Sequence, residues 1–498
     1  MTVIFMEGKS SIIENNIAAL IHSHHRLNVM SLNQYKAPLH KALQLSEDFF
    51  DTLDSTPVGS MKSHEELLSL WDQKLPETGM DPEQILIDMD KAARPGLHLS
   101  QSGRFFSWVI GGSYPTGVAA DWLTSAWDQN AGMFTVAPAA SIAEEIAGKW
   151  LKQILNLPVD ASFAFVTGCQ MAHFTCLAAA RNHLFHQAGW DIEAKGFYGA
   201  PRIRVICGDQ KHSTINRAMR MLGFGTDILT DVPSDEYGRI NVALFEKEFM
   251  KEPDVPTLVL LQAGDLNTGV YDDFNAIIPL AHKFNAWVHV DGAFGLWASA
   301  SKHLSHLTKG IETADSWATD GHKWLNVPYD CGYALTAHPE AHYRSMSQQA
   351  SYVFEDQTAR DSMYWNPEFS RRARGFATYA VIKELGTQGI EELVDRTCAH
   401  ARSIVEQAGK LPHTEIVAMP VINQGLIRFL DPKGNSEKDH AAYTEKVIHE
   451  INESGEAFFQ PVTFKGKRCM RVSVSGWRTS DEDVRRTVAA IREAVSGE

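Results

Sequence analysis

The chain has 498 residues, of which 44% are hydrophobic and 21% are charged, as is ordinary for a soluble globular protein. This length allows a large core and more than one domain. Acidic residues exceed basic ones by 61 to 46, which gives a formal net charge of -15 and argues against nucleic acid or an anionic membrane surface as the main partner.

The first hundred residues predict amphipathic helices, as in "SHEELLSLWDQKL" and "PEQILIDMDKAA", without a catalytic pattern. We place an N-terminal helical segment at residues 1–105. A further helix is expected at "SIAEEIAGKWLKQILNLP", with Ser141 as its N-cap, Glu144 three residues later and Pro158 just after its end.

Short apolar runs then alternate with helical stretches such as "HFTCLAAARNHLFHQ". Strands are expected at 162–167, 202–208, 257–264, 286–293, 315–319 and 331–336. Near-continuous apolar strands that are separated by helices predict a mostly parallel sheet covered on both faces. We therefore expect a large α/β domain over residues 106–411.

The chain changes character after about residue 412. Two helices are expected just before this point, at "SRRARGFATYAVIKELG" and "GIEELVDRTCAHARSIVEQAGKL". Beyond it, the pattern predicts strands at "QGLIRFL" and "KRCMRVSVS" and helices around 438–454 and 480–495. These elements indicate a smaller C-terminal α+β domain over residues 412–498.

Polar residues follow several of the expected strands, where ligands bind in open α/β sheets. The turn "TGCQMAH" leads from the first strand into a helix, whose free N–H groups suit a phosphate. His212 follows the second strand, Asp291 lies near the end of the strand at 286–293, and His322 and Lys323 follow the strand at 315–319. Taken singly, each has an ordinary explanation as a turn glycine, a helix cap or a surface lysine.

Together these residues match the needs of one cofactor. Pyridoxal phosphate requires an anion site, a partner for its ring, a carboxylate at its ring nitrogen and a lysine for a Schiff base. Asp291 would keep the ring nitrogen protonated, so that the ring accepts electrons from a breaking bond. A desolvated, cationic pocket would favour the neutral, nucleophilic amine of Lys323.

Five stretches resemble the pyridoxal-phosphate-dependent group II amino-acid decarboxylases: "FFSWVIGGSYPTGVAADWL", "DQKHSTINRAM", "HVDGAFG", "DGHKWLNVPYDCG" and "PEFSRRARG". The resemblance runs from about residue 90 to the C-terminus. It implies a fold-type I enzyme that removes CO2 from an L-amino acid and leaves the amine. It also implies a homodimer with active sites at the subunit interface, which the N-terminal segment would clasp.

The resemblance also implies roles for single residues. Lys323 would carry the cofactor, and Asp291 would pair with its ring nitrogen. Ala293 would pack on one face of the ring, and His212 on the other, next to the substrate carboxylate. The expected phosphate contacts are His322, Gly168, Cys169 and Gln170.

Other parts of the chain differ from the family pattern. The turn "TGCQMAH" lacks the usual serines, which Gln170 and backbone N–H groups would replace, and Asn267 is a further expected cofactor contact. Gln129 and Asn130 are expected to line a polar substrate pocket, although both also suit a helix end. Candidate anchors for the substrate carboxylate are Arg471 and Arg478, each equally compatible with an exposed strand position.

The residue that returns a proton to the α-carbon decides the product. The position of the family's loop tyrosine matches Ser362, and Tyr352 and Tyr364 lie nearby in the sequence. Loss of that tyrosine would divert the reaction toward an aldehyde, so oxidative decarboxylation and carbon–carbon lyase chemistry stay open as alternatives. A non-enzymatic scaffold would have no chemical need for Lys323, Asp291 and His212 together.

The six cysteines form no CxxC pair, and we expect reduced thiols with neither a disulfide framework nor a metal site. There is no apolar run long enough to span a bilayer, and the N-terminus has no secretory signal pattern. We therefore expect a cytoplasmic protein.

Overall fold

The computed structural model describes residues 34–59, 62–348 and 359–497, and it divides into two compact units, Met1–Leu99 and Ser100–Glu498. The first unit contains a helix that includes residues 34–51, followed by α2 (His64–Trp71), α3 (Pro82–Ala93) and the short η1 (Arg94–Gly96). Ser63 and Glu66 form a capping box at the start of α2, and Asp81 caps α3. None of the helices in these described stretches combines the length and apolarity that a membrane span needs.

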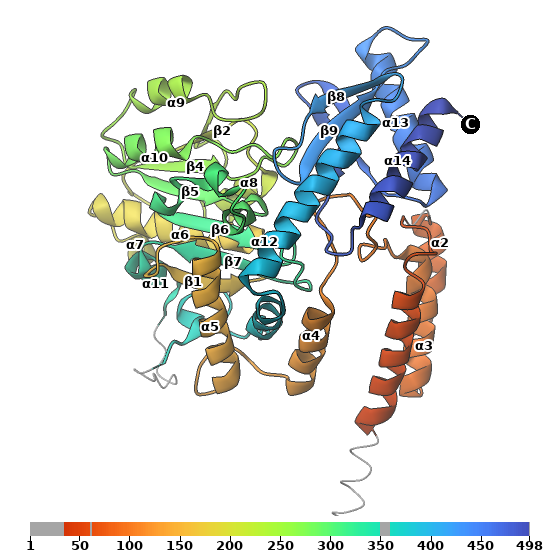
Figure 1. Cartoon of the computed structure of the whole chain (residues 1–498). Helices are drawn as coiled ribbons and strands as arrows, with labels where there is room; N and C mark the ends of the chain where they lie inside the picture. Colours follow the sequence, from red (N-terminus) through yellow and green to blue (C-terminus); the bar gives the residue numbers. More distant parts are fainter. Residues whose placement is uncertain (1–33, 60–61, 349–358, 498) are drawn as a thin grey trace, which may run out of the picture. The chain divides into compact units, whose positions relative to one another are not determined.

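A seven-stranded sheet forms the centre of the second unit (Figure 1). Its strands run in the order β1-β7-β6-β5-β4-β2-β3. Only β7 is antiparallel to its neighbours, so the mostly parallel sheet is confirmed, and β1, β2, β4, β5 and β6 share one carboxyl edge. The bounds are β1 (Ser162–Val166), β2 (Arg204–Gly208), β3 (Leu229–Val232), β4 (Thr257–Gln262), β5 (Trp287–Asp291), β6 (Ser316–Asp320) and β7 (Gly332–Thr336).

Helices cover both faces of this sheet because successive strand residues point to opposite sides. On β5, for example, Val288 and Val290 face one core cluster, whereas Trp287 faces the other. The first face packs against α5 (Pro138–Ile154), α9 (Val242–Phe249), α10 (Phe274–His282) and α12 (Gly375–Ala408). The second packs against α6 (Cys169–Gln187), α7 (Ile192–Lys195), α8 (Ser213–Met221) and α11 (Pro339–Met346).

Helix α5 corrects one prediction. It begins at Pro138, one turn before the expected N-cap, because proline suits the first turn of a helix. Ser141 is therefore a buried residue inside the helix and not its cap. Glu144 is also buried, and its carboxylate lies 2.7 Å from Nη1 of Arg371, so these polar side chains face the interior of the protein.

The two helices expected before residue 412 form the long α12, which is interrupted at Gly386 by a left-handed φ of 59°. Beyond α12, a four-stranded antiparallel sheet has the order β10-β11-β9-β8. Two helices pack on it and build a second core, so the smaller α+β region is confirmed. The bounds are β8 (Thr414–Ala418), β9 (Gln424–Phe429), α13 (Glu437–Ser454), β10 (Gln460–Phe464), β11 (Lys467–Ser473) and α14 (Asp481–Ser496).

The remaining elements of the second unit are helix α4, which packs against α12, and four short 3-10 helices. They are α4 (Pro115–Trp127), η2 (Gly295–Ala300), η3 (Ser305–Thr308), η4 (Ile311–Thr313) and η5 (Ser362–Tyr364). The edge strand β3 was not predicted, because "LTDV" has no apolar run and only Val232 of it is buried. All six cysteines are free thiols.

Candidate active site

A cavity of about 310 Å³ lies at the carboxyl edge of the large sheet. Its wall is made mostly of the segments that follow β1, β2, β4, β5 and β6, as the topology of a parallel sheet requires. Eight of the sequence-predicted cofactor residues line it: Gly168, Cys169, Gln170, His212, Asp291, Ala293, His322 and Lys323. The structure thus brings together residues that are up to 155 positions apart in the chain.

Lys323 faces an acidic environment, in contrast to the expected cationic pocket. Its Nζ lies 3.1 Å from Oδ2 of Asp320, and its side chain is 23% exposed. Burial by itself would lower the pKa of Lys323, but the charges of Asp320 and Asp291 raise the pKa above its usual value. The free amine is therefore held as an ammonium, and Asp320 is its counter-ion.

Asp291 ends β5 with both carboxylate oxygens held. Oδ1 accepts a hydrogen bond from the backbone N–H of Ala293 at 3.1 Å, and Oδ2 lies 3.4 Å from Nε2 of His173. Burial would raise the pKa of Asp291, but His173, followed by His212 and Lys323, lowers it below its usual range. The side chain is thus a fixed carboxylate, suited to a protonated ring nitrogen.

The turn between β1 and α6 has the shape and the unpaired groups of a phosphate site. A Cβ atom at Gly168 would lie 2.8 Å from Cε1 of His322, so only glycine fits there. Both amide atoms of Gln170 are buried and have no hydrogen-bond partner among the described residues. Because a buried unpaired amide is costly, this side chain fits a polar ligand in the cavity. Burial raises the pKa of the Cys169 thiol, so the turn carries no thiolate to repel an anion.

Two histidines offer N–H groups at the cavity. His212 is the N-cap of α8, and its Nδ1 accepts the backbone N–H of Thr214 at 3.3 Å. Nδ1 of His322 accepts the backbone N–H of Cys331 at 3.1 Å. Burial lowers the pKa of both imidazoles. Each is therefore neutral with its proton on Nε2, where it can donate to an anion.

Arg471 on β11 is a buried guanidinium without a partner. It is only 3% exposed, and its Nε atom is buried without a hydrogen-bond partner among the described residues. Burial lowers its pKa to about 10, although Asp265 opposes this shift, and its charge in turn contributes to lowering the pKa of His212. A desolvated cation of this kind favours an anionic ligand nearby.

Four further predicted residues, in addition to Arg471, do not line the cavity. Asn130 accepts the backbone N–H of Arg371 through Oδ1, and Gln129 donates to the carbonyl of Trp127. Asn267 belongs to a tight turn in which Asp265 accepts its backbone N–H at 2.9 Å. The fourth, Arg478, is half-buried, with its guanidinium 5.8 Å from the ring centre of Trp477.

The residues proposed for proton return are also placed elsewhere in the chain. Ser362 is buried in η5, where its hydroxyl donates to Oε1 of Glu144 at 3.0 Å. Tyr364 is buried in the same turn and packs near Tyr343. Neither of these two residues lines the cavity. Tyr352 lies outside the described residues.

Sequence reasoning missed several cavity residues. Asp320 ends β6, so the rule that ligands bind at carboxyl ends of strands would have found it. Trp108 reaches the cavity from a segment with no strand, and its left-handed φ of 57° gives no sequence signal. The others are Thr167, Thr214, Gln262, Gly264, Leu266 and Phe294.

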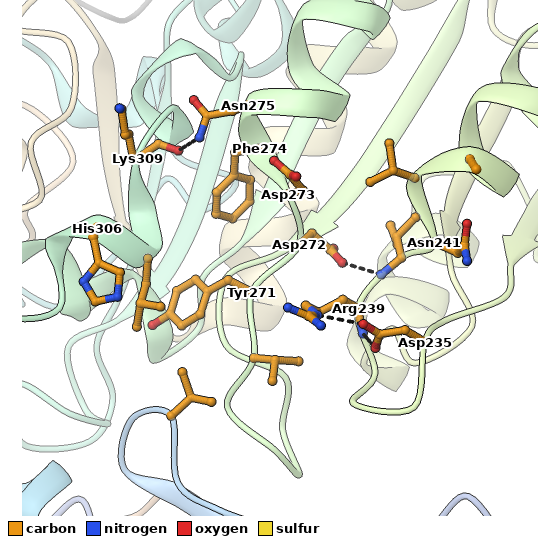
Figure 2. A pocket seen from close by; sticks show the side chains of 16 residues that line it. Asp235, Arg239, Asn241, Tyr271, Asp272, Asp273, Phe274, Asn275, His306 and Lys309 are labelled. Carbon is orange, nitrogen blue, oxygen red and sulfur yellow. Dashed lines mark hydrogen bonds and ion pairs between the residues drawn. The ribbon is translucent and has the colours of Figure 1, made fainter.

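A second, larger cavity of about 570 Å³ lies beside the loops that follow β3 and β4 (Figure 2). Most of its polar side chains are already paired. Asp272 accepts the backbone N–H groups of Ile240 and Gln262 at 2.7 and 2.8 Å, and Asp235 pairs with Arg239 at 2.8 Å. Among the described residues that line it, none has a buried side-chain nitrogen or oxygen without a partner.

Comparison with known proteins agrees with this geometry. The family model described as the pyridoxal-dependent decarboxylase conserved domain matches residues 64–430. An aromatic-L-amino-acid decarboxylase of Bacillus atrophaeus is 26% identical over 467 residues, or 92% of this chain and 95% of that protein. A 4-hydroxyphenylacetaldehyde synthase of Rhodiola rosea is 24% identical over 446 residues, or 87% of this chain and 89% of that protein.

Solved structures share the fold. The crystal structure of Oryza sativa TDC with PLP and tryptamine superposes with a TM-score of 0.88 at 21% identity, over 93% of this chain and 98% of that chain. The crystal structure of mouse CSAD in apo form superposes with a TM-score of 0.85 at 23% identity, over 92% of this chain and 98% of that chain. The predicted fold-type I architecture is confirmed.

Proposed function

Because this chain belongs to the pyridoxal-dependent decarboxylase family, we propose that the smaller cavity is the site where an L-amino acid is decarboxylated. Lys323 and Asp291 line this cavity, and Arg471, which does not line it, acts from beside His212. The chain is a pyridoxal-phosphate-dependent carboxy-lyase that converts an amino acid to an amine and CO2. The observation that carries the assignment of the site is the meeting of an amine, a fixed carboxylate and an unpaired buried amide at one sheet edge.

The residues of the cavity divide the task. Bound here, pyridoxal phosphate supplies a cationic ring that withdraws electrons from the α-carbon. Lys323 would provide the amine that holds the cofactor. Asp291 would keep the ring nitrogen protonated, and Gln170 and His322, which line the cavity, would donate to the phosphate.

Arg471 and His212 are assigned to the substrate carboxylate. The guanidinium of Arg471 has a buried Nε without a hydrogen-bond partner among the described residues, and His212 offers its Nε2–H at the cavity wall. Together they would orient the carboxylate so that its bond to the α-carbon aligns with the electron-accepting ring. Departure of CO2 then leaves the α-carbon to take up a proton, which gives the amine.

The aldehyde outcome is tested against the amine outcome, because relatives of both kinds match this chain. Purified enzyme loaded with cofactor is incubated with each common L-amino acid, and amine, CO2, aldehyde and hydrogen peroxide are measured together. We expect equal amounts of CO2 and amine from one class of amino acid, without peroxide. Peroxide and aldehyde in equal amounts would replace the amine assignment, and no CO2 from any amino acid would reject it.

We further propose a cytoplasmic homodimer. Six free cysteines fit a reducing compartment. Helix α4 exposes Trp122, Leu123 and Trp127 at 39%, 48% and 49%, an apolar surface that suits a subunit interface. In the first unit, α2 buries none of its residues, which fits a role as a clasp on a second subunit. Light scattering coupled to gel filtration tests this assembly: a monomer at working concentration would reject it.

A further inference from the structure

A line of buried hydrogen bonds leads from the cavity into the sheet. His173 on α6 lies 3.4 Å from Oδ2 of Asp291 through Nε2, and its Nδ1 lies 3.0 Å from Nε2 of His289. Nδ1 of His289 lies 2.9 Å from the hydroxyl of Ser316, which accepts the indole N–H of Trp287 at 2.9 Å. Both imidazoles and the serine are fully buried, so water cannot replace any of these partners.

The indole sets the order of the protons along this line. Trp287 can only donate, so the oxygen of Ser316 accepts from it and directs its own proton to Nδ1 of His289. His289 then carries its proton on Nε2 and donates to Nδ1 of His173. His173 in turn carries its proton on Nε2, toward the carboxylate of Asp291.

The reverse order leaves groups unmatched. With the proton on Nδ1 of His289, the hydroxyl proton of Ser316 would have no acceptor in this line. The lone pair of Nε2 on His173 would then face the carboxylate of Asp291, which is repulsive in a buried site, and only the weak S–H donor of Cys169, with Sγ 3.4 Å from Nε2, could pair with it. Burial, and then the neighbouring His173, lower the pKa of His289 to about 3, so this ring stays neutral and has a single proton to place.

The other groups around Asp291 do not replace this donor. Lys323 acts on the carboxylate by charge, His212 is neutral, and so is the buried thiol of Cys169. The backbone N–H of Ala293 occupies the opposite oxygen, Oδ1. The Oδ2 side of the carboxylate is therefore oriented by His173, and through it by His289 and Ser316.

We propose that His173, His289 and Ser316 are positioning residues, which form a proton-ordered line that orients the Asp291 carboxylate toward the ring nitrogen of the cofactor. This inference rests on the proposed role of Asp291. Its consequence is that Ser316, which does not line the cavity, controls how strongly the site recognises that nitrogen.

The test compares two ligands on wild-type apoenzyme and two variants. Pyridoxal phosphate is titrated against 1-deazapyridoxal 5′-phosphate, in which C–H replaces the ring nitrogen, and the ratio of the two dissociation constants measures recognition of the nitrogen. We expect Ser316→Ala to reduce this ratio by roughly fivefold, the usual worth of one well-placed hydrogen bond.

Ser162→Ala is the matched control. Ser162 on β1 makes a similar buried bond of 2.8 Å to Nδ1 of His342, whose other ring nitrogen bonds to the carbonyl of Trp365 and not to Asp291, so this variant should keep the wild-type ratio. Equal ratios for Ser316→Ala and wild type, or the same loss in Ser162→Ala, would overturn the proposal. A wild-type enzyme that binds both ligands equally would instead contradict the role of Asp291 itself.

A neutron structure of the wild-type holoenzyme keeps the proposal testable if Ser316→Ala does not fold. We expect protons on Nε2 of both His173 and His289 and none on their Nδ1 atoms. Protons on the Nδ1 atoms would overturn the proposed order.

Discussion

Two cavities of the large domain differ in whether their buried polar groups have partners, and this difference does not follow from their volumes. The larger, of about 570 Å³, has acidic and basic side chains that hold one another and the surrounding backbone. The smaller, of about 310 Å³, contains an amide with no partner and lies near a guanidinium with none. An unpaired buried amide is costly in the free protein, so the one that lines the smaller cavity suits a polar ligand that pairs with it.

Substitution of the lysine in each cavity should give the largest difference in cofactor capture and in kcat. Lys323→Ala should remove covalent capture of the cofactor and lower kcat by about a thousandfold or more, because the nucleophilic amine is lost. Lys309→Ala in the larger cavity should leave both unchanged. Absorbance spectroscopy and CO2 release measure the two effects, and equal losses in both variants would remove the distinction between the cavities.

Substitution of Asp291 in the smaller cavity should give the next largest effect on kcat. Asp291→Ala should still bind the cofactor, but we expect kcat to fall by roughly a hundredfold or more, because the ring nitrogen loses its fixed carboxylate. The measurement is steady-state decarboxylation with saturating cofactor. Near-full activity in this variant would contradict the assignment of Asp291 as the partner of the ring nitrogen.

Substitution of Arg471 should change substrate binding without changing cofactor binding. Arg471→Met should raise KM for the amino acid by about tenfold to a hundredfold, the worth of a charge-assisted hydrogen bond, with little change in cofactor affinity. Arg239→Met in the larger cavity should leave KM unchanged. An unchanged KM in Arg471→Met would show that another group anchors the carboxylate.

Asp320 predicts how cofactor capture depends on pH. Because Asp320 and Asp291 raise the pKa of Lys323, the neutral amine is scarce at neutral pH, and its fraction grows about tenfold per pH unit below that pKa. The rate of capture by apoenzyme should therefore rise between pH 6 and pH 8, about the physiological range. Asp320→Asn should capture faster at pH 7, and stopped-flow absorbance gives the rates; a slower variant would contradict the effect of this counter-ion.

The smallest effect on activity belongs to Asp272 in the larger cavity. Burial raises its pKa to about 7, whereas in the unfolded chain it titrates near 4. The unfolded state therefore binds fewer protons between these values, and stability should fall as pH rises from about 4 to 7, by up to about 1.4 kcal/mol per unit. Asp272→Asn should flatten this profile in urea unfolding and leave kcat unchanged; a large loss of kcat would place the larger cavity in the reaction.

The meeting of the proposed cofactor residues at one cavity was predictable from sequence because these residues follow strands. Once apolar runs locate parallel strands, their carboxyl ends must meet at one edge, and Gly168, His212, Asp291 and Lys323 come together whatever the details of packing. The same rule also applies to Asp320 at the end of β6. Only His322 and Lys323 of the neighbouring motif "GHK" were named from the sequence, and this aspartate was missed.

The positions of residues that do not follow strands depend on tertiary contacts, which no local sequence pattern indicates. Ser141 was predicted as a cap but is buried inside α5, since Pro138 starts the helix one turn earlier. Ser362 was placed in the reaction by its distance from a motif, yet its hydroxyl bonds to Glu144, 218 positions away. The unpaired state of Arg471 likewise follows from how the small domain packs, not from its strand sequence.

The central claim is that Lys323 is the residue that holds the cofactor. Apoenzyme is loaded with pyridoxal phosphate, reduced with borohydride to fix any Schiff base, digested and analysed by peptide mass spectrometry. We predict a single phosphopyridoxyl group on the peptide that contains "DGHKWLNVPYDCG". A label on another lysine, or no label on protein that is folded by circular dichroism, would contradict the account.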